Sequence, residues 1–261
     1  MEPVPPALAT LVRDGTLDPE LAALVWLAFD AGIPVVAAGE PSTARAALRD
    51  AVAALADVAE GSDGRRPIVR LAGDAETFDW MPEASELGWD SVVRAAGRAA
   101  APGRRGALMV ADLVADAPKP TWGEHARLVI RALTAGYCLA ATAEGDRLEE
   151  VLSRLSAAPV SAIDDELTRL GIVLILGPDA SGVTRVQAAH YLRPVARDVN
   201  GHIQRLAPAA LATWNGKTAR FDHFAWGLID ELAGRADMRP LAFEREQAAR
   251  AGRLAGASRA F

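Results

Sequence analysis

Residues 33–48 read IPVVAAGEPSTARAAL. The first six residues are an apolar run typical of a buried strand, and Gly39 then breaks this run. A short polar stretch follows, and the alanine-rich segment after it favours a helix from about Ala44 to Val58. Ser42 or Thr43 can cap this helix. A strand, a glycine turn and a helix in this order are the layout of a phosphate-binding P-loop.

The turn departs from the P-loop pattern at its functional positions. G-x-x-x-x-G-K-[ST] ends in Gly-Lys-Ser/Thr, where this chain has Ala44-Arg45-Ala46. Arg45 keeps a positive charge but lacks the compact ammonium group of lysine, and Ala46 has no hydroxyl to bind Mg²⁺. Glu40 adds negative charge where a triphosphate would lie. Three interpretations stay open: a plain strand–turn–helix, an anion site at the helix N-terminus, and a working nucleotide site.

Composition narrows the class of protein. A chain of 261 residues that is 51% hydrophobic and 24% charged is typical of a globular protein with ample core. Its net charge of −6 gives no electrostatic reason to expect a nucleic-acid partner. The single cysteine, Cys138, excludes an internal disulfide and is typical of a reducing compartment. The first residues lack a signal-peptide pattern, and no apolar run reaches about 20 residues. We therefore expect a cytoplasmic protein without direct membrane insertion.

Apolar runs alternate with helical patterns up to residue 177. Asp18 followed by Pro19 predicts the start of an N-terminal helix that Gly32 ends. The expected strands are 33–38, 67–73, 107–112, 137–143 and 171–176, and the later helices are 44–58, 90–100, 121–135, 146–156 and 161–170. This alternation predicts an α/β fold, mainly a parallel sheet with helices on both faces.

The pattern changes after Gly177. The segments 183–192, 202–208 and the stretch around Trp214 predict antiparallel strands, followed by helices at 223–234 and 240–256. Asn215-Gly216 favours a hairpin turn of type I′, so the GKT at 216–218 is not interpreted as a P-loop. We predict a core at 1–177 and a small β/helical C-terminal extension at 178–261 packed on it.

In order and spacing, these segments resemble the motor domain of the type II/type IV secretion and pilus-assembly ATPases. Residues 11–39 resemble the segment that leads into that family's P-loop, 67–76 its acidic-box strand, 107–112 its Walker B strand and 132–155 its histidine-box strand and helix. The resemblance covers roughly residues 7–176 and implies a RecA-like P-loop core. It also implies assembly through this domain.

Most catalytic positions implied by the resemblance are altered. The acidic-box pair matches Ala72 and Gly73, so only Glu76 keeps a carboxylate nearby, and Asp112 matches the Walker B acid. The resemblance places the family's two histidines in the stretch 135–144, and this stretch contains no histidine. The scattered histidines lack metal-ligand spacing and are interpreted as surface or interface residues: His125, His190, His202 and His223.

These losses together predict a catalytically inactive P-loop ATPase homologue, a pseudo-ATPase acting as a scaffold or regulatory subunit. Glu76 and Asp112 would be vestigial, with no cofactor and no metal expected. Its partners would be other proteins or further copies of itself. The candidates for nucleotide or anion binding are Gly39, Ser42, Thr43 and Arg45. Two alternatives remain: a divergent ATPase that uses Arg45 and Asp112 with ATP and Mg²⁺, and an anion or small-ligand sensor at the helix N-terminus.

Overall fold

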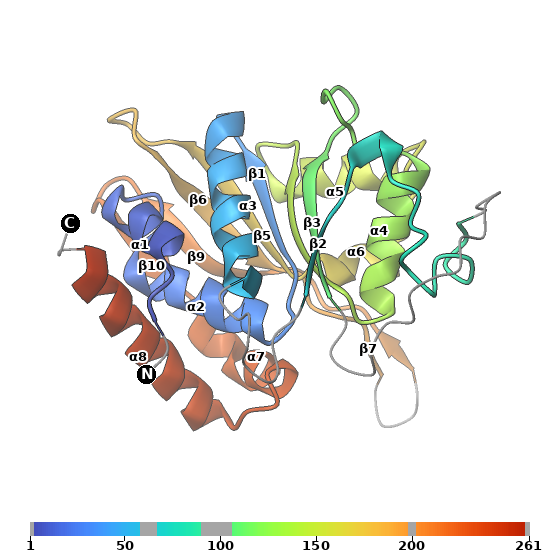
Figure 1. Cartoon of the computed structure of the whole chain (residues 1–261). Coiled ribbons are helices and arrows are strands. Elements are labelled where there is room, and N and C mark those ends of the chain that lie inside the picture. Colours follow the sequence, from blue (N-terminus) through green and yellow to red (C-terminus); the bar gives the residue numbers. More distant parts are fainter. Residues whose placement is uncertain (1–2, 58–66, 90–105, 198–201, 259–261) are drawn as a thin grey trace.

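The structure is a computed structural model that describes residues 3–57, 67–89, 106–197 and 202–258 (Figure 1). The helix predicted at 90–100 lies outside these residues. In the described part of the chain, no helix is long and apolar enough to cross a membrane.

An eight-stranded sheet forms the centre of the fold, in the order β10-β9-β6-β5-β1-β4-β3-β2. Its strands are β1 (Val35–Gly39), β2 (Ile68–Arg70), β3 (Ala107–Leu113), β4 (Cys138–Ala143), β5 (Ile172–Pro178), β6 (Thr184–Tyr191), β9 (Ala209–Asn215) and β10 (Arg220–His223). The helices are α1 (Pro6–Arg13), α2 (Pro19–Asp30), α3 (Ser42–Asp57), α4 (Glu124–Thr134), α5 (Leu148–Ser156), α6 (Asp164–Leu167), α7 (Ile229–Arg235) and α8 (Pro240–Ser258).

Five neighbouring strands run parallel, in the order β5-β1-β4-β3-β2. Every residue of β1 and of β4 is buried, because helices cover both faces of this part of the sheet. The prediction of an α/β fold with a mostly parallel sheet is confirmed. The sheet also has an antiparallel part, formed by β6, β9 and β10.

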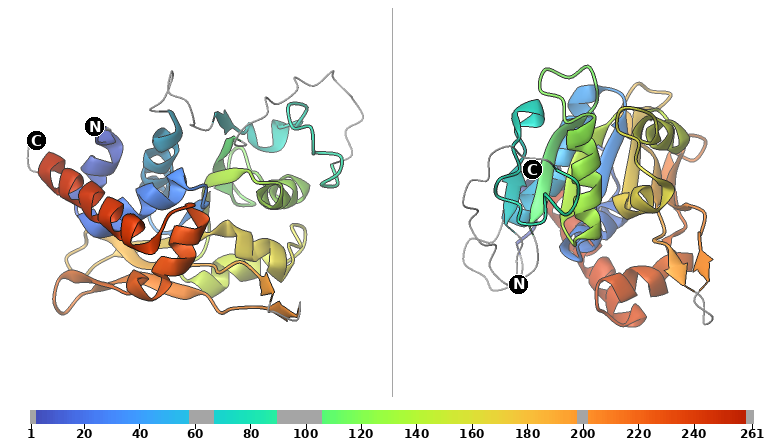
Figure 2. Two further views of the ribbon diagram at one scale, coloured as in Figure 1. Left: turned by 90° about the horizontal axis from the view of Figure 1, so that it is seen from below. Right: turned by 90° about the vertical axis from the view of Figure 1, so that its right-hand side faces the viewer.

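Alternate residues of the central strands enter two different cores. Val35 and Ala37 pack in one core with α1, α2, α3, α7 and α8. Val36 and Ala38 pack in the other core with α4, α5 and α6. The period of two follows from the pleat of a strand. The fold therefore has a helical layer on each side of the sheet (Figure 2).

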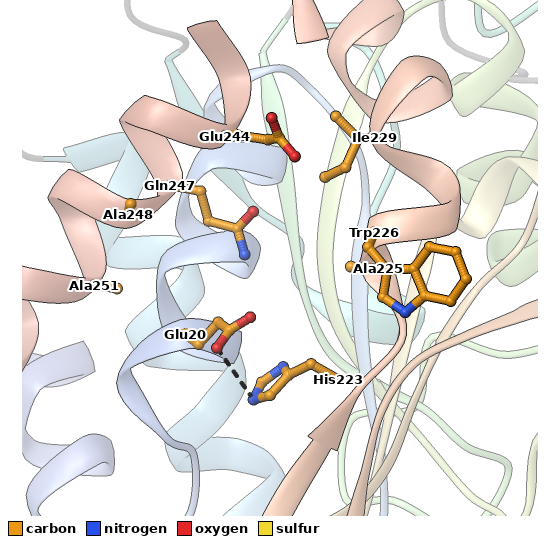
Figure 3. Close-up of a pocket in the computed structure, with 9 residues that line it drawn as sticks. All are labelled: Glu20, His223, Ala225, Trp226, Ile229, Glu244, Gln247, Ala248 and Ala251. Carbon is orange, nitrogen blue, oxygen red and sulfur yellow. Dashed lines mark ion pairs between the residues drawn. The ribbon is translucent and has the colours of Figure 1, made fainter. Parts of the chain in front are cut away.

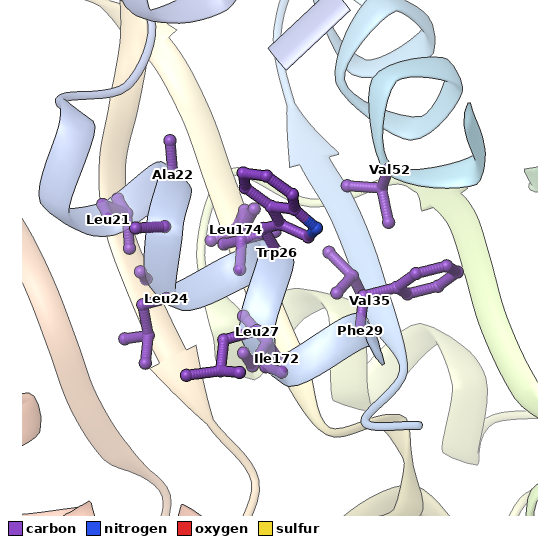
Figure 4. Packing of buried hydrophobic residues seen from close by; sticks show 14 of the residues in the cluster. Leu21, Ala22, Leu24, Trp26, Leu27, Phe29, Val35, Val52, Ile172 and Leu174 are labelled. Atoms are coloured by element: carbon purple, nitrogen blue, oxygen red, sulfur yellow. The ribbon is translucent and has the colours of Figure 1, made fainter. Parts of the chain in front are cut away.

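Helix α2 begins and ends where its sequence predicts. The Asp18 side chain accepts a hydrogen bond of 2.9 Å from the Leu21 amide, Pro19 is the first helical residue, and Gly32 follows the helix with φ of 83°. All nine residues from Leu21 to Phe29 are buried. Figure 4 shows why: α2 packs among the residues of β1, α3 and β5, with Trp26 between them.

The antiparallel strands extend the same sheet. β5 pairs with β1 on one side and with β6 on the other, so the boundary predicted after Gly177 falls inside a single strand. β9 and β10 continue the sheet outward. Helix α8 returns along α1 and α2, which places the last described residues beside the first (Figure 1).

Some predicted boundaries differ from the structure. The segment predicted at 202–208 is a strand only at β8 (Ile203–Gln204), which pairs with β7 (Ala196–Arg197) outside the main sheet. The β9–β10 turn spans four residues, 216–219, and is longer than the two-residue type I′ turn. The Asn215 side chain accepts from the amides of Lys217 and Thr218, which stabilises this wider turn.

Candidate functional site

The predicted binding residues lie where the central parallel strands end. β1 ends at Gly39, β3 carries Asp112 close to its end, and β4 carries Thr142 between them. Ala37 is paired with Thr142, and Val110 with Ala141, so these strand ends lie side by side. In open α/β sheets, ligands bind at this edge.

Gly39 is required by the contact between two strands. Its φ is +91°, and a Cβ atom placed on it would lie 1.9 Å from the Leu176 carbonyl oxygen of β5. The Glu40 amide donates a hydrogen bond of 3.2 Å to the same oxygen. Only glycine permits this approach of the backbones. The packing of β1 against β5 therefore explains why residue 39 is a glycine, and no bound phosphate is needed to explain it.

Only Glu40 and Pro41 separate the end of β1 from the start of α3. The helix predicted to begin at Ala44 begins at Ser42 instead. The Pro41 carbonyl accepts from the amides of Ala44, at 3.0 Å, and Arg45, at 3.2 Å, and so starts the helix two residues earlier. A P-loop needs a longer glycine-rich stretch to surround phosphates with backbone amides.

Ser42 and Thr43 lie in the first turn of α3 rather than before it. Both residues are exposed. They therefore do not take the predicted N-cap position, because a capping residue must precede the first turn of the helix. Their amides face the N-terminal end of α3, where anions are favoured in general.

Arg45 folds back onto the turn that precedes it. Its side chain is only 7% exposed. Nη1 donates hydrogen bonds to the Gly39 carbonyl and, at 3.0 Å, to Glu40 Oε1. Nε has no hydrogen-bond partner among the described residues. The guanidinium therefore closes the β1–α3 turn internally.

Asp112 lies in a hydrogen-bonded group that the sequence did not indicate. The Thr142 hydroxyl contacts the Ala111 carbonyl and lies 2.6 Å from Asp112 Oδ1. Arg49 of α3 donates to the same Ala111 carbonyl at 2.6 Å. These contacts join α3, β3 and β4. Thr142 could have been noticed, because it is the one polar residue in the buried run of β4.

Glu76 organises its own loop. Its carboxylate accepts hydrogen bonds from the amides of Ala72, Thr77 and Phe78 and from the Trp80 indole, all at 3.1 to 3.2 Å. Phe78 has a positive φ of 56°, which is uncommon for a bulky residue. These four hydrogen bonds to the loop explain the presence of a carboxylate at position 76 without a catalytic role.

The histidines are dispersed over the fold. His125 lies 3.1 Å from the Glu76 carbonyl, and His223 lies 2.8 Å from Asp18. Burial lowers the pKa of His190, which Glu149 only partly offsets. Among the described residues, no group of three or more His, Cys, Asp or Glu is arranged to hold a metal.

The fold and this edge define the class of protein as an α/β protein whose parallel half carries a strand–turn–helix unit at its centre. No protein-family model matches the sequence, and no curated protein matches it either.

Proposed function

We propose that the chain is a non-catalytic relative of the secretion and pilus-assembly ATPase motor domain, acting as a scaffold or regulatory subunit. In this proposal the parallel half of the sheet is a RecA-like core that has kept its strand–turn–helix unit and lost phosphate chemistry. The protein acts in the cytoplasm by binding other proteins or further copies of itself.

The observation that carries the proposal is the position of Arg45. Its guanidinium is hydrogen-bonded to Gly39 and paired with Glu40, so it is not available to neutralise phosphates in this arrangement. A two-residue connection supplies too few amides to surround a triphosphate. Ala46, the residue after Arg45, has no hydroxyl for Mg²⁺.

The two alternatives need groups that have other partners here. A divergent ATPase needs Arg45 and Asp112, which are bonded to Glu40 and Thr142. An anion sensor needs positive charge at the start of α3, but the Glu40 carboxylate lies against the nearest guanidinium.

Calorimetric titration tests the proposal. We expect no Mg²⁺-dependent heat of binding for ATP at concentrations up to about 1 mM, a range that detects an ordinary nucleotide site. Arg45→Ala serves as the matched variant. Micromolar, Mg²⁺-dependent binding that disappears in Arg45→Ala would overturn the proposal. Binding of inorganic phosphate without Mg²⁺, lost in the same variant, would favour the anion sensor.

A further inference from the structure

A pocket of about 460 Å³ lies where α2, β10 and α8 meet (Figure 3). It is formed by the start of α2, the end of β10, the turn before α7 and the middle of α8. Its lining residues are Glu20, His223, Ala225, Trp226, Ile229, Glu244, Gln247, Ala248 and Ala251. This volume suits a small molecule or the end of a long side chain.

The charge of the pocket is negative. Glu20 of α2 and Glu244 of α8 place exposed carboxylates on two of its sides. Among the described residues that line it, His223 is the only basic one, and its Nε2 lies 2.8 Å from Asp18 and 3.8 Å from Glu20. The lining therefore has two carboxylates and one imidazole, and that imidazole is already paired with Asp18. An anionic ligand would be repelled.

Gln247 supplies a separate indication of a ligand. It is only 9% exposed, and its carboxamide points from α8 into the pocket, toward Glu20 and His223 (Figure 3). The carboxamide makes no hydrogen bond within the described part of the chain. Because a carboxamide has both donor and acceptor atoms, Gln247 can donate to and accept from a molecule bound in the pocket.

The remaining lining is apolar and mostly small. Ala225, Ala248, Ala251 and Ile229 leave room for a hydrocarbon stem between α7 and α8. Trp226 lies beside them and is 80% exposed. An exposed indole beside carboxylates is a common surface for cations, which are attracted to the ring face.

We propose that this pocket binds an organic cation, a guanidinium or ammonium group on an alkyl stem. Glu20 and Glu244 would neutralise the cation, the Gln247 carboxamide oxygen would accept one of its hydrogen bonds, and the alanines and Ile229 would contact the stem. A divalent metal fits less well, because the described acidic residues and histidines form no metal-binding group of three. The site is independent of the function proposed above.

Two kinds of ligand present such a cation: a free alkylamine, or the arginine or lysine side chain of a partner protein. Agmatine represents the first, and the peptide acetyl-Gly-Arg-Gly-amide represents the second. The same peptide with citrulline in place of arginine is a neutral control of nearly equal shape.

Calorimetric titration of the full chain at low salt tests the site. We expect agmatine or the arginine peptide to bind with a Kd below about 1 mM and the citrulline peptide to bind at least about tenfold more weakly. Glu20→Gln and Glu244→Gln are each expected to weaken binding about tenfold, because each removes one charge from the pocket. Gln247→Leu is expected to weaken it less, through one lost hydrogen bond.

Glu149→Gln is the matched control, since Glu149 is an exposed carboxylate on α5, in the other helical layer. It should leave binding unchanged. Tighter binding of the peptide assigns the site to a partner's side chain, and tighter binding of agmatine assigns it to a free amine. The proposal is overturned if neither cation binds, if citrulline binds as well as arginine, or if the Glu20→Gln, Glu244→Gln double variant keeps full affinity.

Discussion

Nε2 of His223 lies 2.8 Å from Oδ2 of Asp18, although the two residues are 205 positions apart in the chain. Oδ1 of the same carboxylate accepts from the Leu21 amide and caps α2. One side chain therefore starts a helix and also fastens it to the end of β10. Both contacts are partly buried, so water screens them less than a surface pair.

This contact predicts a pH-dependent stability. Burial acts to lower the pKa of His223, but the hydrogen bond to Asp18 and the charges of Asp18, Glu20 and Asp222 outweigh it and raise the pKa above its usual 6.5. Below pH 6.5 both states carry the proton, and the stabilisation is present in full. Above it the unfolded state loses the proton first, so the free energy of unfolding falls as pH rises through the folded-state pKa.

Urea unfolding at half-unit steps from pH 6 to pH 9 measures this effect. We expect His223→Asn to remove the decline above pH 6.5. Asp18→Asn keeps a capping side chain but removes its charge, so it should flatten the profile at a small cost to α2. A decline of equal size in all three proteins would show that another group causes it.

The close contact at Gly39 predicts that one added methyl group strongly destabilises the fold. Gly39→Ala forces an unfavourable positive φ and drives Cβ into the Leu176 carbonyl, so we expect a loss of about 3 kcal/mol or more in the free energy of unfolding. Gly182→Ala is the matched control. Gly182 also has positive φ, +82°, but its Cβ would meet no atom within 4 Å, so the expected loss is about 1 kcal/mol. Equal losses would contradict the role assigned to the β1–β5 contact.

The Arg45–Glu40 ion pair joins a buried and an exposed side chain, so we expect substitutions of the two partners to cost unequal amounts of stability. Arg45→Met keeps the apolar stem but leaves the buried Gly39 carbonyl without its charged donor, and we expect a loss of about 2 kcal/mol. Glu40→Gln changes a side chain that is 65% exposed and should cost less than about 1 kcal/mol. Chemical denaturation measures both. An Arg45→Met protein of unchanged stability would argue that the guanidinium is kept for a ligand rather than for the turn.

Thr142 and Asp112 predict an energetic coupling between β3 and β4. Thr142→Val preserves shape and removes the buried hydroxyl, while Asp112→Ala removes its carboxylate partner. A double-mutant cycle should give a coupling of about 1 kcal/mol. Additive losses would mean that the hydroxyl is used only by the Ala111 carbonyl.

Local patterns were sufficient for much of the fold. Asp18, Pro19 and Gly32 predicted the two ends of α2, because capping and termination depend on residues that are neighbours in the chain. The apolar runs predicted β1, β3, β4 and β5, since a strand buried on both faces needs no polar alternation. The predicted length of the strand at 202–208 was too great, since only the two residues of β8 form it. A short pairing outside the main sheet depends on the partner strand and not on the composition of the segment itself.

The sites depended on contacts that the sequence does not display. Gln247 reads as an ordinary helical residue, and only the approach of α8 to α2 and α7 makes it a buried amide facing a pocket. His223 was expected at a surface or an interface, and its pairing with Asp18 follows from the antiparallel addition of β10 to the sheet.

The sequence by itself determined that the turn after β1 lacks the lysine and the hydroxyl of a P-loop, because residue identity alone decides which chemical groups are present. Only the tertiary structure decided what the remaining groups do. Gly39 meets the β5 backbone, and Arg45 turns back to its carbonyl and to Glu40. The physical reason is that a side chain's partners are set by the packing of strands and helices distant in sequence, and a buried guanidinium bonds to whichever acceptors that packing brings within reach.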